Sequence, residues 1–383
     1  NMSIQERLNN AILKRRHENA LRELTVTNNL VDFCSNDYLG FAQNAEIHDY
    51  LLQELPKLRK IGSTGSRLLK GNYSLIEKVE NEIANFHQAP AALFFNSGFE
   101  ANAGLIASVV SRHDTIIYDE LCHASLREGI RLSAATAFSF AHNDTAALTN
   151  KLQKAKGEKF IVIESVYSMD GDCCPLKEIV SIAKTFNAAI ILDEAHATGV
   201  IGNKGQGLAQ HLALQNDIFA RVHTFGKAIG NNGAVVMGDE VLRQYLINFC
   251  KPFIYTTAPN YLQVLAVKKA YTLLAGQHES IATLNKNIQH FTFLISRFKH
   301  IQMLPSGSAI FSIIIPGNDS VKLAAKYIQN AGYDVRPVLS PTVPEGKERL
   351  RICLHSFNTE LEIERFVKLL EQITGIIQSD TTA

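Results

Sequence analysis

Short apolar runs alternate with helical stretches from about residue 30 to residue 240, and this alternation restricts the possible folds more than any other feature of the chain. The runs are too short for helices and are rich in Ile, Val, Ala and Phe, which is typical of buried strands. Parallel strands need crossover connections, usually helices such as those predicted at 75–87 and 176–186. We therefore predict a large α/β domain with a mainly parallel sheet. Its predicted strands are 91–96, 115–118, 137–139, 160–164, 188–193, 222–224 and 233–237.

The pattern changes towards the C-terminus. After a long helical stretch at 261–298, the order strand, helix, strand, strand, helix predicts a compact α+β unit. Its elements are predicted at 309–315, 320–331, 333–338, 350–354 and 359–374. At the other end, 3–24 has the apolar spacing of an amphipathic helix. We predict an N-terminal helix and arm at 2–35, a large domain at 36–275, a smaller α+β domain at 276–378 and a disordered tail at 379–383.

Composition indicates a small-molecule partner. Lys and Arg number 38 and Asp and Glu 37, so the net charge gives no reason to expect nucleic acid. No apolar run reaches the roughly 18 residues of a membrane helix, and the N-terminal residues are polar, so we expect a cytoplasmic protein without a membrane span. The six cysteines lack metal-ligand spacing, which favours reduced thiols and no bound metal.

Two strand ends carry the candidate chemistry. Asp193 ends one predicted strand, at the edge where open α/β sheets place their ligands, although an Asp-Glu pair there also suits a magnesium site or a structural cap. Lys227 follows the next predicted strand within the Gly-flanked segment TFGK. A nucleotide phosphate loop would need Gly at 221 and a hydroxyl residue at 228, and Arg221 and Ala228 exclude it.

Asp193 and Lys227 together meet two requirements of pyridoxal 5'-phosphate (PLP) chemistry. A carboxylate keeps the pyridine nitrogen protonated, and an amine holds the cofactor as a Schiff base. The hydroxyl of Thr224 can bind a phosphate oxygen. A catalytic lysine must be partly deprotonated, which burial or a neighbouring positive charge can achieve. An exposed, solvated lysine is the alternative interpretation of Lys227.

From NDYLG at 36–40 to the C-terminal domain, the chain resembles the α-oxoamine synthases, which condense an amino acid with an acyl thioester and release carbon dioxide. The matching motifs are GSTGSR at 62–67, SGFEAN at 97–102, HAS at 123–125, SMDGD at 168–172, DEAH at 193–196 and TFGK at 224–227. The resemblance implies the fold-type I, aspartate aminotransferase-like fold for the large α/β domain. It also implies PLP as cofactor and an amino acid and an acyl thioester as substrates.

The resemblance assigns a role to each candidate residue. The predicted catalytic residues are Lys227, His123, Asp193 and His196. His123 would stack on the pyridine ring and His196 would bind the cofactor's phenolic oxygen, with Ser168 beside it. The predicted phosphate ligands are Ser97, Gly98 and Phe99 at a helix start, with Thr224. Thr256 and Thr257 would come from a neighbouring subunit, so a homodimer with shared active sites is implied.

The substrate residues come from the same match. Arg351 would bind the amino-acid carboxylate through its planar guanidinium, while Arg349 is expected to be solvated. Arg22 and Thr342 match positions near the acyl substrate, and Asn36 is also assigned to the substrate site.

Three functions remain open. Motifs such as HATG at 196–199 and PTVP at 341–344 are most similar to members that join L-alanine to a pimeloyl thioester in biotin synthesis. A sister enzyme using glycine or serine is the alternative, since Arg67 also occurs in serine-using members. A non-catalytic binding protein on the same scaffold is the third.

Overall fold

The computed structural model describes residues 2–26, 29–276 and 278–382, without the side chains of 278 and 378–382. The chain forms two compact units. The large unit comprises Asn36–Ser168 and Asp172–Leu284. The small unit contains the segment up to Ser35, Met169–Gly171 and the chain from Asn285 onwards. The N-terminal segment thus groups with the C-terminal part, and the division falls inside helix α12.

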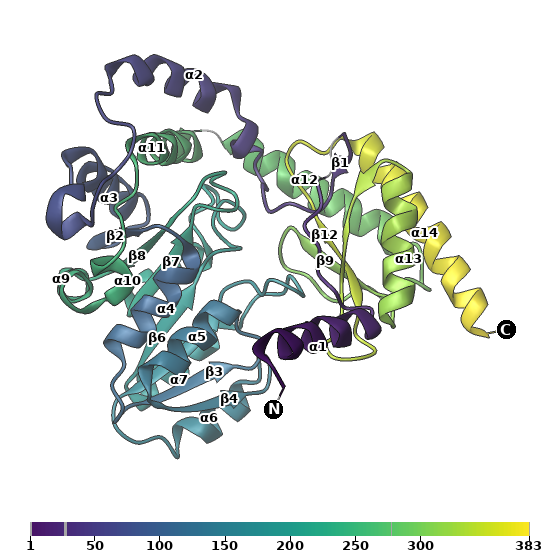
Figure 1. Cartoon of the computed structure of the whole chain (residues 1–383), viewed down its shortest axis with the longest axis horizontal. Helices are drawn as coiled ribbons and strands as arrows, with labels where there is room; N and C mark the ends of the chain where they lie inside the picture. The colour runs from purple at the N-terminus through teal and green to yellow at the C-terminus, as the bar shows by residue number, and fades with distance from the viewer. Residues whose placement is uncertain (1, 27–28, 277, 383) are drawn as a thin grey trace. The chain divides into compact units, whose positions relative to one another are not determined.

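The large unit is built on a seven-stranded sheet with the order β2-β8-β7-β6-β5-β3-β4 (Figure 1). Its strands are β2 (Ala91–Phe95), β3 (Thr115–Asp119), β4 (Thr136–Phe140), β5 (Lys159–Glu164), β6 (Ala188–Asp193), β7 (Ala220–Thr224) and β8 (Ala234–Gly238). β3 to β7 are mutually parallel, whereas β8 pairs antiparallel with both β7 and β2. The predicted mainly parallel sheet is therefore confirmed, with one antiparallel strand that the sequence did not indicate.

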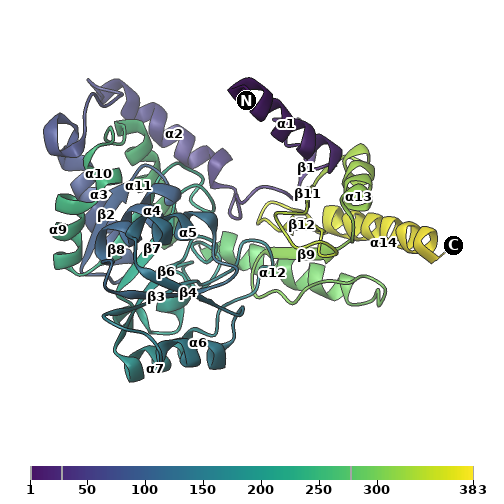
Figure 2. The same ribbon diagram turned by 60° about the horizontal axis from the view of Figure 1, so that its bottom comes forward.

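Most helices of the large unit flank this sheet, whereas α2 packs against α11 (Figures 1 and 2). They are α2 (Ala45–Glu54), α3 (Ser74–Phe86), α4 (Gly98–Val109), α5 (Ala124–Ser133), α6 (Thr145–Leu152), α7 (Leu176–Phe186), α8 (Leu208–His211), α9 (Glu240–Phe249), α10 (Lys251–Ile254) and α11 (Tyr261–Gly276). Gly129 allows α5 to approach α4, because a Cβ there would lie 2.9 Å from Ile106 Cβ. The two helices therefore pack closely along their middle turns.

Strand register aligns three carboxyl ends at that edge. Glu164 at the end of β5 pairs with Asp193 at the end of β6, and Asp193 pairs with Val222 of β7. Residues that follow these strands therefore start from neighbouring positions, which is why parallel sheets gather functional side chains there.

The small unit has a three-stranded antiparallel sheet with the order β11-β12-β9 and a short parallel pair, β1 with β10. The strands are β1 (Val31–Asp32), β9 (Ile310–Ile314), β10 (Tyr333–Asp334), β11 (Arg336–Val338) and β12 (Arg349–Cys353). Helix α13 (Asn318–Asn330) packs on α14 (Glu360–Thr382) and on this sheet. The single strand predicted at 333–338 is thus wrong, because its two halves join different sheets.

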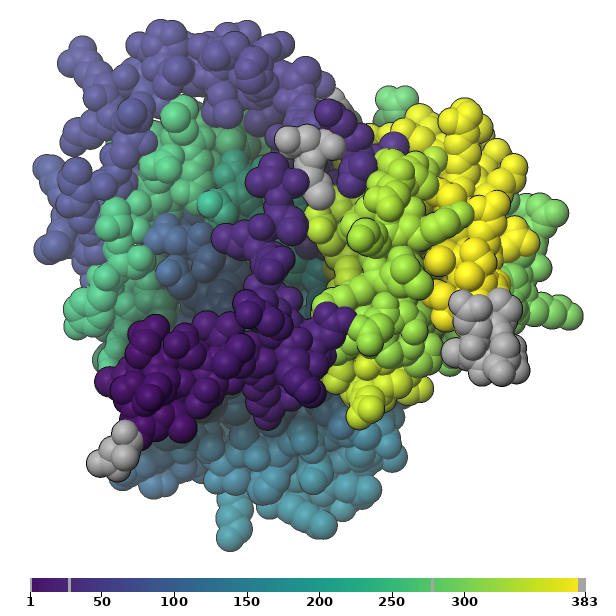
Figure 3. All heavy atoms as spheres, turned by 45° about the vertical axis from the view of Figure 1, so that its right-hand side comes forward, coloured from purple at the N-terminus to yellow at the C-terminus, as the bar shows by residue number. Residues whose placement is uncertain are grey.

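Helix boundaries also differ from the prediction. Helix α1 (Ile4–His17) ends at His17 and not near residue 24, because Asn19, two residues later, adopts a left-handed conformation with φ of 48°. None of its described residues is buried, and Figure 3 shows α1 in dark purple on the surface. The stretch at 261–298 is divided into α11 and α12 (His278–Ile295). Helix α14 continues to Thr382, through residues predicted to be a disordered tail.

Among the described residues, no helix combines the length and hydrophobicity required to cross a bilayer.

A pair of histidines lies in the core of the large unit. The rings of His87 and His223 are fully buried, with centroids 4.0 Å apart. His87 Nε2 lies 3.0 Å from the Tyr271 hydroxyl, and His223 Nδ1 lies 2.8 Å from Thr198 Oγ1. Burial lowers the pKa of both imidazoles well below their usual range, and the charge of Arg221 lowers each pKa further.

Acidification is expected to destabilise the large unit through this pair. An unfolded histidine has a pKa of about 6.5. Below that pH the unfolded chain binds protons that the folded chain does not, so the free energy of unfolding falls by about 1.4 kcal/mol per pH unit for each histidine. His223→Asn keeps a polar group near Thr198 and should remove about half of this dependence of the free energy of unfolding on pH. The measurement is urea unfolding at several pH values, followed by circular dichroism. His113→Asn, at an exposed position, is the control; equal slopes for both variants would contradict the expectation.

Candidate active site

A cavity of about 190 Å³ opens at the carboxyl ends of β5, β6 and β7. It is lined by Gly98, Phe99, Asn102, His123, Ser125, Glu164, Asp193, Ala195, His196, Val222, Thr224 and Lys227. The structure therefore brings together all four predicted catalytic residues and three of the predicted phosphate ligands. All come from the large unit, from strand ends and from the first turns of α4 and α5.

Asp193 is held firmly at the cavity wall. Its side chain is buried, and both oxygens accept hydrogen bonds. The Ala195 amide donates to Oδ1 at 2.8 Å, and Asn102 Nδ2 donates to Oδ2 at 2.7 Å. Its neighbour Glu194 does not line the cavity and instead accepts from the amides at the start of α8. The two acids of the DEAH motif therefore have different roles.

A second buried carboxyl, Glu164, lies beside Asp193 and was missed in the sequence. Burial raises the pKa of Glu164 well above its usual range, and the charge of Asp193 adds to this while Lys227 opposes it. Glu164 also accepts a hydrogen bond from the backbone amide of His123. Its position in the sequence could have identified it, because Glu164 is the last residue of its strand, as Asp193 is of the next.

His123 caps α5 with its ring, because Nδ1 accepts from the Ser125 amide at 3.2 Å. Burial lowers the pKa of His123, the negative charge of Asp193 raises it, and the positive charge of Lys227 lowers it. The ring thus lies within electrostatic reach of the two residues predicted to bind the pyridine nitrogen and the aldehyde carbon of PLP.

The start of α4 provides the features that a phosphate requires. The first amides of a helix have no intrahelical acceptor and lie at its positive end. Ser97 Oγ accepts from the Glu100 amide at 3.1 Å, which leaves the amides of Gly98 and Phe99 directed out of the helix end. A Cβ on Gly98 would lie 3.2 Å from Thr224 Oγ1, so glycine keeps the space between α4 and β7 open.

These features fit PLP. The cavity offers a carboxylate for the pyridine nitrogen, an amine for the aldehyde, an imidazole for the ring face and a helix start for the phosphate. Each group comes from a different element, and the strand register places them in one cavity.

Other predicted residues lie outside the cavity lining. Ser168 is not part of it. Thr256 and Thr257 contact Asn96, whose Nδ2 donates to Thr256 Oγ1 at 3.2 Å, and line a separate small cavity. Asn36 is linked to the site indirectly, through Tyr38. The Tyr38 hydroxyl donates to Asn36 Oδ1 at 3.2 Å and lies 2.8 Å from His196 Nδ1.

Arg351 and Arg349 lie on β12 of the small unit. Arg351 is half-buried, and its Nη1 lies 3.1 Å from Cys353 Sγ. The expectation that Arg349 is solvated is wrong, because its side chain is 6% exposed and forms an ion pair with Asp170. Residues two apart in a strand share one face, so alternation does not separate the two arginines.

The residues matched to the acyl substrate meet within the small unit. Arg22 Nη2 donates to Thr342 Oγ1 at 3.2 Å, although the two residues are far apart in the sequence.

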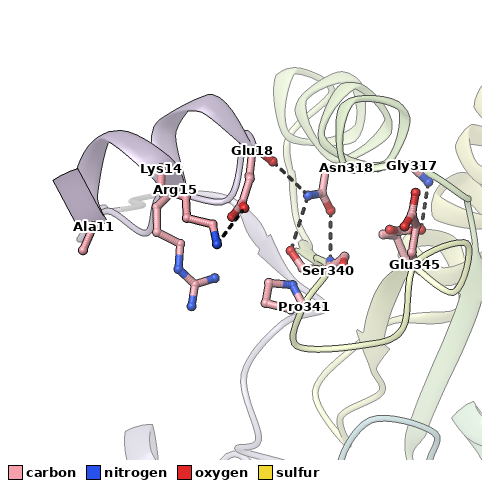
Figure 4. Close-up of a pocket in the computed structure, with 10 residues that line it drawn as sticks. Ala11, Lys14, Arg15, Glu18, Gly317, Asn318, Ser340, Pro341 and Glu345 are labelled. Carbon is pink, nitrogen blue, oxygen red and sulfur yellow. Dashed lines mark hydrogen bonds and ion pairs between the residues drawn. The ribbon is translucent and has the colours of Figure 1, made fainter.

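Pro341, next to Thr342, lines a cavity of about 680 Å³ together with residues of α1 (Figure 4). Asn318 also lines this cavity, and its Nδ2 donates to the backbone carbonyls of Glu18 at 3.2 Å and Ser340 at 3.3 Å. Its walls carry charges of both signs, including Lys14 and Glu18.

Comparisons with known proteins agree on one family. The model for aminotransferase class I and II matches residues 28–370. An 8-amino-7-oxononanoate synthase from Emericella nidulans is 40% identical, and the match covers 98% of this chain and 96% of the relative. Aminoacyl transferase sphA from Byssochlamys spectabilis is 39% identical, and the match covers 89% of this chain and 80% of the relative.

Among solved structures, a serine palmitoyltransferase from S. paucimobilis with bound PLP-myriocin aldimine has a TM-score of 0.91. It is 23% identical and covers 99% of this chain and 100% of its own, which establishes a shared fold. With a family model over most of its length and a near full-length relative at 40% identity, the chain belongs to the α-oxoamine synthases, PLP-dependent acyltransferases of the class I and II aminotransferase family.

Proposed function

We propose that this enzyme condenses L-alanine with a pimeloyl thioester, carried by CoA or an acyl carrier protein, to give 8-amino-7-oxononanoate for biotin synthesis. The reaction forms a carbon–carbon bond between the alanine α-carbon and the acyl carbonyl, and releases the thiol and carbon dioxide. The observation that carries the proposal is the convergence of Asp193, Lys227, His123 and the start of α4 in one cavity. The similarity to the 8-amino-7-oxononanoate synthase from Emericella nidulans, 40% identical over 98% of this chain, supports the choice of substrates.

The large unit would hold the cofactor. Asp193 would bind the pyridine nitrogen, and the amides of Gly98 and Phe99 with Thr224 would bind the phosphate. His123 would lie on the ring face and His196 near the phenolic oxygen, while Thr256 and Thr257 would serve the phosphate of the partner subunit. Bound PLP supplies an electron sink for negative charge that develops on the substrate α-carbon.

The protein's own groups would move the protons. Lys227 Nζ would take the α-proton of the amino acid and return a proton to the α-carbon after carbon dioxide leaves. Asp193 would face the pyridine nitrogen throughout. The Arg351 guanidinium would bind the amino-acid carboxylate until decarboxylation, which orients the α-hydrogen. Arg22 and Thr342 would contact the acyl chain.

A sister activity on glycine or serine is the second candidate. The sequence raised this candidate through Arg67, and a relative named aminoacyl transferase sphA is compatible with it. However, Arg67 does not line the cavity: it is buried and bonded to Glu80 and Asn72, donating to Asn72 Oδ1 at 2.8 Å. Its presence is therefore explained by packing in the large unit and does not determine the amino acid.

The two candidates are separated by measuring thiol release. Purified enzyme with PLP is supplied with pimeloyl-CoA, acetyl-CoA or palmitoyl-CoA, each with alanine, glycine or serine. We expect the largest kcat/KM with alanine and pimeloyl-CoA, and the product mass of 8-amino-7-oxononanoate. A preference for serine with palmitoyl-CoA, or for glycine with acetyl-CoA, would replace the first proposal by the second.

Arg351→Lys is expected to raise KM for the amino acid by about 10- to 100-fold, because a point charge replaces a bidentate pair. KM for the thioester should change little. The measurement is steady-state kinetics with each substrate varied in turn. Arg365→Lys, an exposed substitution on α14 of the same unit, is the matched control. Equal changes in both KM values would argue against carboxylate binding by Arg351.

A further inference from the structure

A continuous chain of hydrogen bonds links Asp193 to His123 through Asn102 and Ser125, two residues of the matching motifs that received no role in the sequence analysis. Asn102 Nδ2 lies 2.7 Å from Asp193 Oδ2 and 3.0 Å from Ser125 Oγ. Ser125 Oγ in turn lies 2.8 Å from His123 Nδ1. Asn102 and Ser125 are both buried, and all four residues line the same cavity.

The orientation of the Asn102 amide follows from its neighbours. A carboxylate can only accept, so the group facing Asp193 Oδ2 must be the NH₂ of Asn102. Its second N–H then points at Ser125 Oγ. Within the described part of the chain, Asn102 Oδ1 is buried without a hydrogen-bond partner. In the flipped amide, Asn102 Oδ1 would face Asp193 Oδ2 at 2.7 Å, and both oxygens are acceptors. Asp193 therefore fixes the orientation of the amide.

The proton position on His123 follows in the same way. Because Ser125 Oγ accepts from Asn102, its own hydrogen can be donated to His123 Nδ1. The backbone amide of Ser125 also points at Nδ1, at 3.2 Å, and an amide hydrogen cannot rotate away. Two donors therefore meet at Nδ1, which leaves no room for a hydrogen there. The neutral ring must carry its hydrogen on Nε2.

We propose that Asn102 and Ser125 are positioning residues that hold His123 in its Nε2–H tautomer, with the orientation of Asn102 set by Asp193. His123 then offers an N–H donor, and not a base, to whatever occupies the cavity. The charged groups that act on the ring are Asp193 and Lys227, while Glu164 accepts from the His123 backbone amide; the three come from different strand ends. The tautomer follows from the hydrogen bonds alone, while its use in catalysis rests on the proposed function.

The first test reads the tautomer directly. Full-length enzyme loaded with PLP and labelled with ¹⁵N in the histidine imidazoles is examined by long-range ¹H–¹⁵N NMR, and His123→Gln identifies the His123 signals. We expect the Nδ1 shift of an unprotonated nitrogen and the Nε2 shift of a protonated one. A protonated Nδ1 in the unmodified enzyme would overturn the proposal, whether or not the enzyme condenses alanine.

The second test removes the hydroxyl donor. Ser125→Ala takes one of two donors from Nδ1, so the NMR-titrated pKa of His123 should rise by about 0.5 to 1 unit, because one neutral hydrogen bond has about that energy. The same shift should appear in the pH profile of kcat. Ser125→Thr, which keeps a hydroxyl, should restore the original value.

Ser133→Ala supplies the matched control, because Ser133 is buried at the other end of α5 and its hydroxyl donates to the Ile130 carbonyl. A merely structural role for Ser125 would reduce the amount of folded enzyme in both alanine variants without moving the His123 pKa. An unchanged pKa in folded Ser125→Ala would overturn the role of Ser125. If that variant fails to fold, the tautomer measured in the unmodified enzyme still decides the proposal.

Discussion

Lys227→Ala is expected to lower kcat by at least about 10⁴-fold, because it removes the group that both holds the cofactor and moves the α-proton. The fold should persist, since Lys227 follows β7 in a loop at the cavity and does not form part of the hydrophobic core. Turnover is measured as thiol release under PLP saturation, and folding by circular dichroism. The absorption band of lysine-bound PLP should also be absent.

Lys204→Ala controls for the loss of a positive charge, because Lys204 is exposed in the same unit and lies outside the cavity. It should retain turnover and the absorption band. A Lys227→Ala enzyme with near-normal thiol release would exclude Lys227 as the proton-transfer group, and with it the proposed chemistry.

Asp193→Asn is expected to lower kcat by about 10²- to 10³-fold, the range found when one fixed electrostatic contact to a developing charge is lost. The amide has the same size, so the change removes the charge opposite the pyridine nitrogen and little volume. It also replaces an acceptor by a possible donor opposite Asn102 Nδ2, which removes one of the two hydrogen bonds at this side chain. PLP retention during dialysis should fall together with kcat.

Asp144→Asn is the matched substitution. Asp144 caps α6 by accepting from the Ala147 amide at 2.8 Å, and Asn caps helices about as well as Asp does. This variant should keep normal turnover. Normal kcat and PLP retention in Asp193→Asn would show that the carboxylate does not face the pyridine nitrogen.

Local sequence patterns predicted much of the sheet and the two central residues. The strand runs were apparent because buried parallel strands are short and rich in branched side chains. Asp193 and Lys227 were apparent because they follow such runs, and strand ends are where parallel sheets bind ligands. Glu164 obeys the same rule, so the sequence contained its signal as well.

Other features depended on contacts between distant segments. The antiparallel direction of β8 and the division between β10 and β11 are set by pairing partners, which no local pattern encodes. The end of α1 depends on the backbone conformation of a single residue, Asn19. The burial of Arg349 follows from its ion pair with Asp170, which is remote in sequence.

The amino-acid sequence by itself determined the α/β sheet, the family and the acid and amine of the site, because periodicity and motifs are properties of neighbouring residues. Only the tertiary structure showed that Asn102 on α4 joins Asp193 on β6 to Ser125 and His123 at the start of α5. Hydrogen bonds of this kind need the helices to pack closely and the strands to be in register. Their direction, and with it the position of a proton, therefore follows from the folded arrangement.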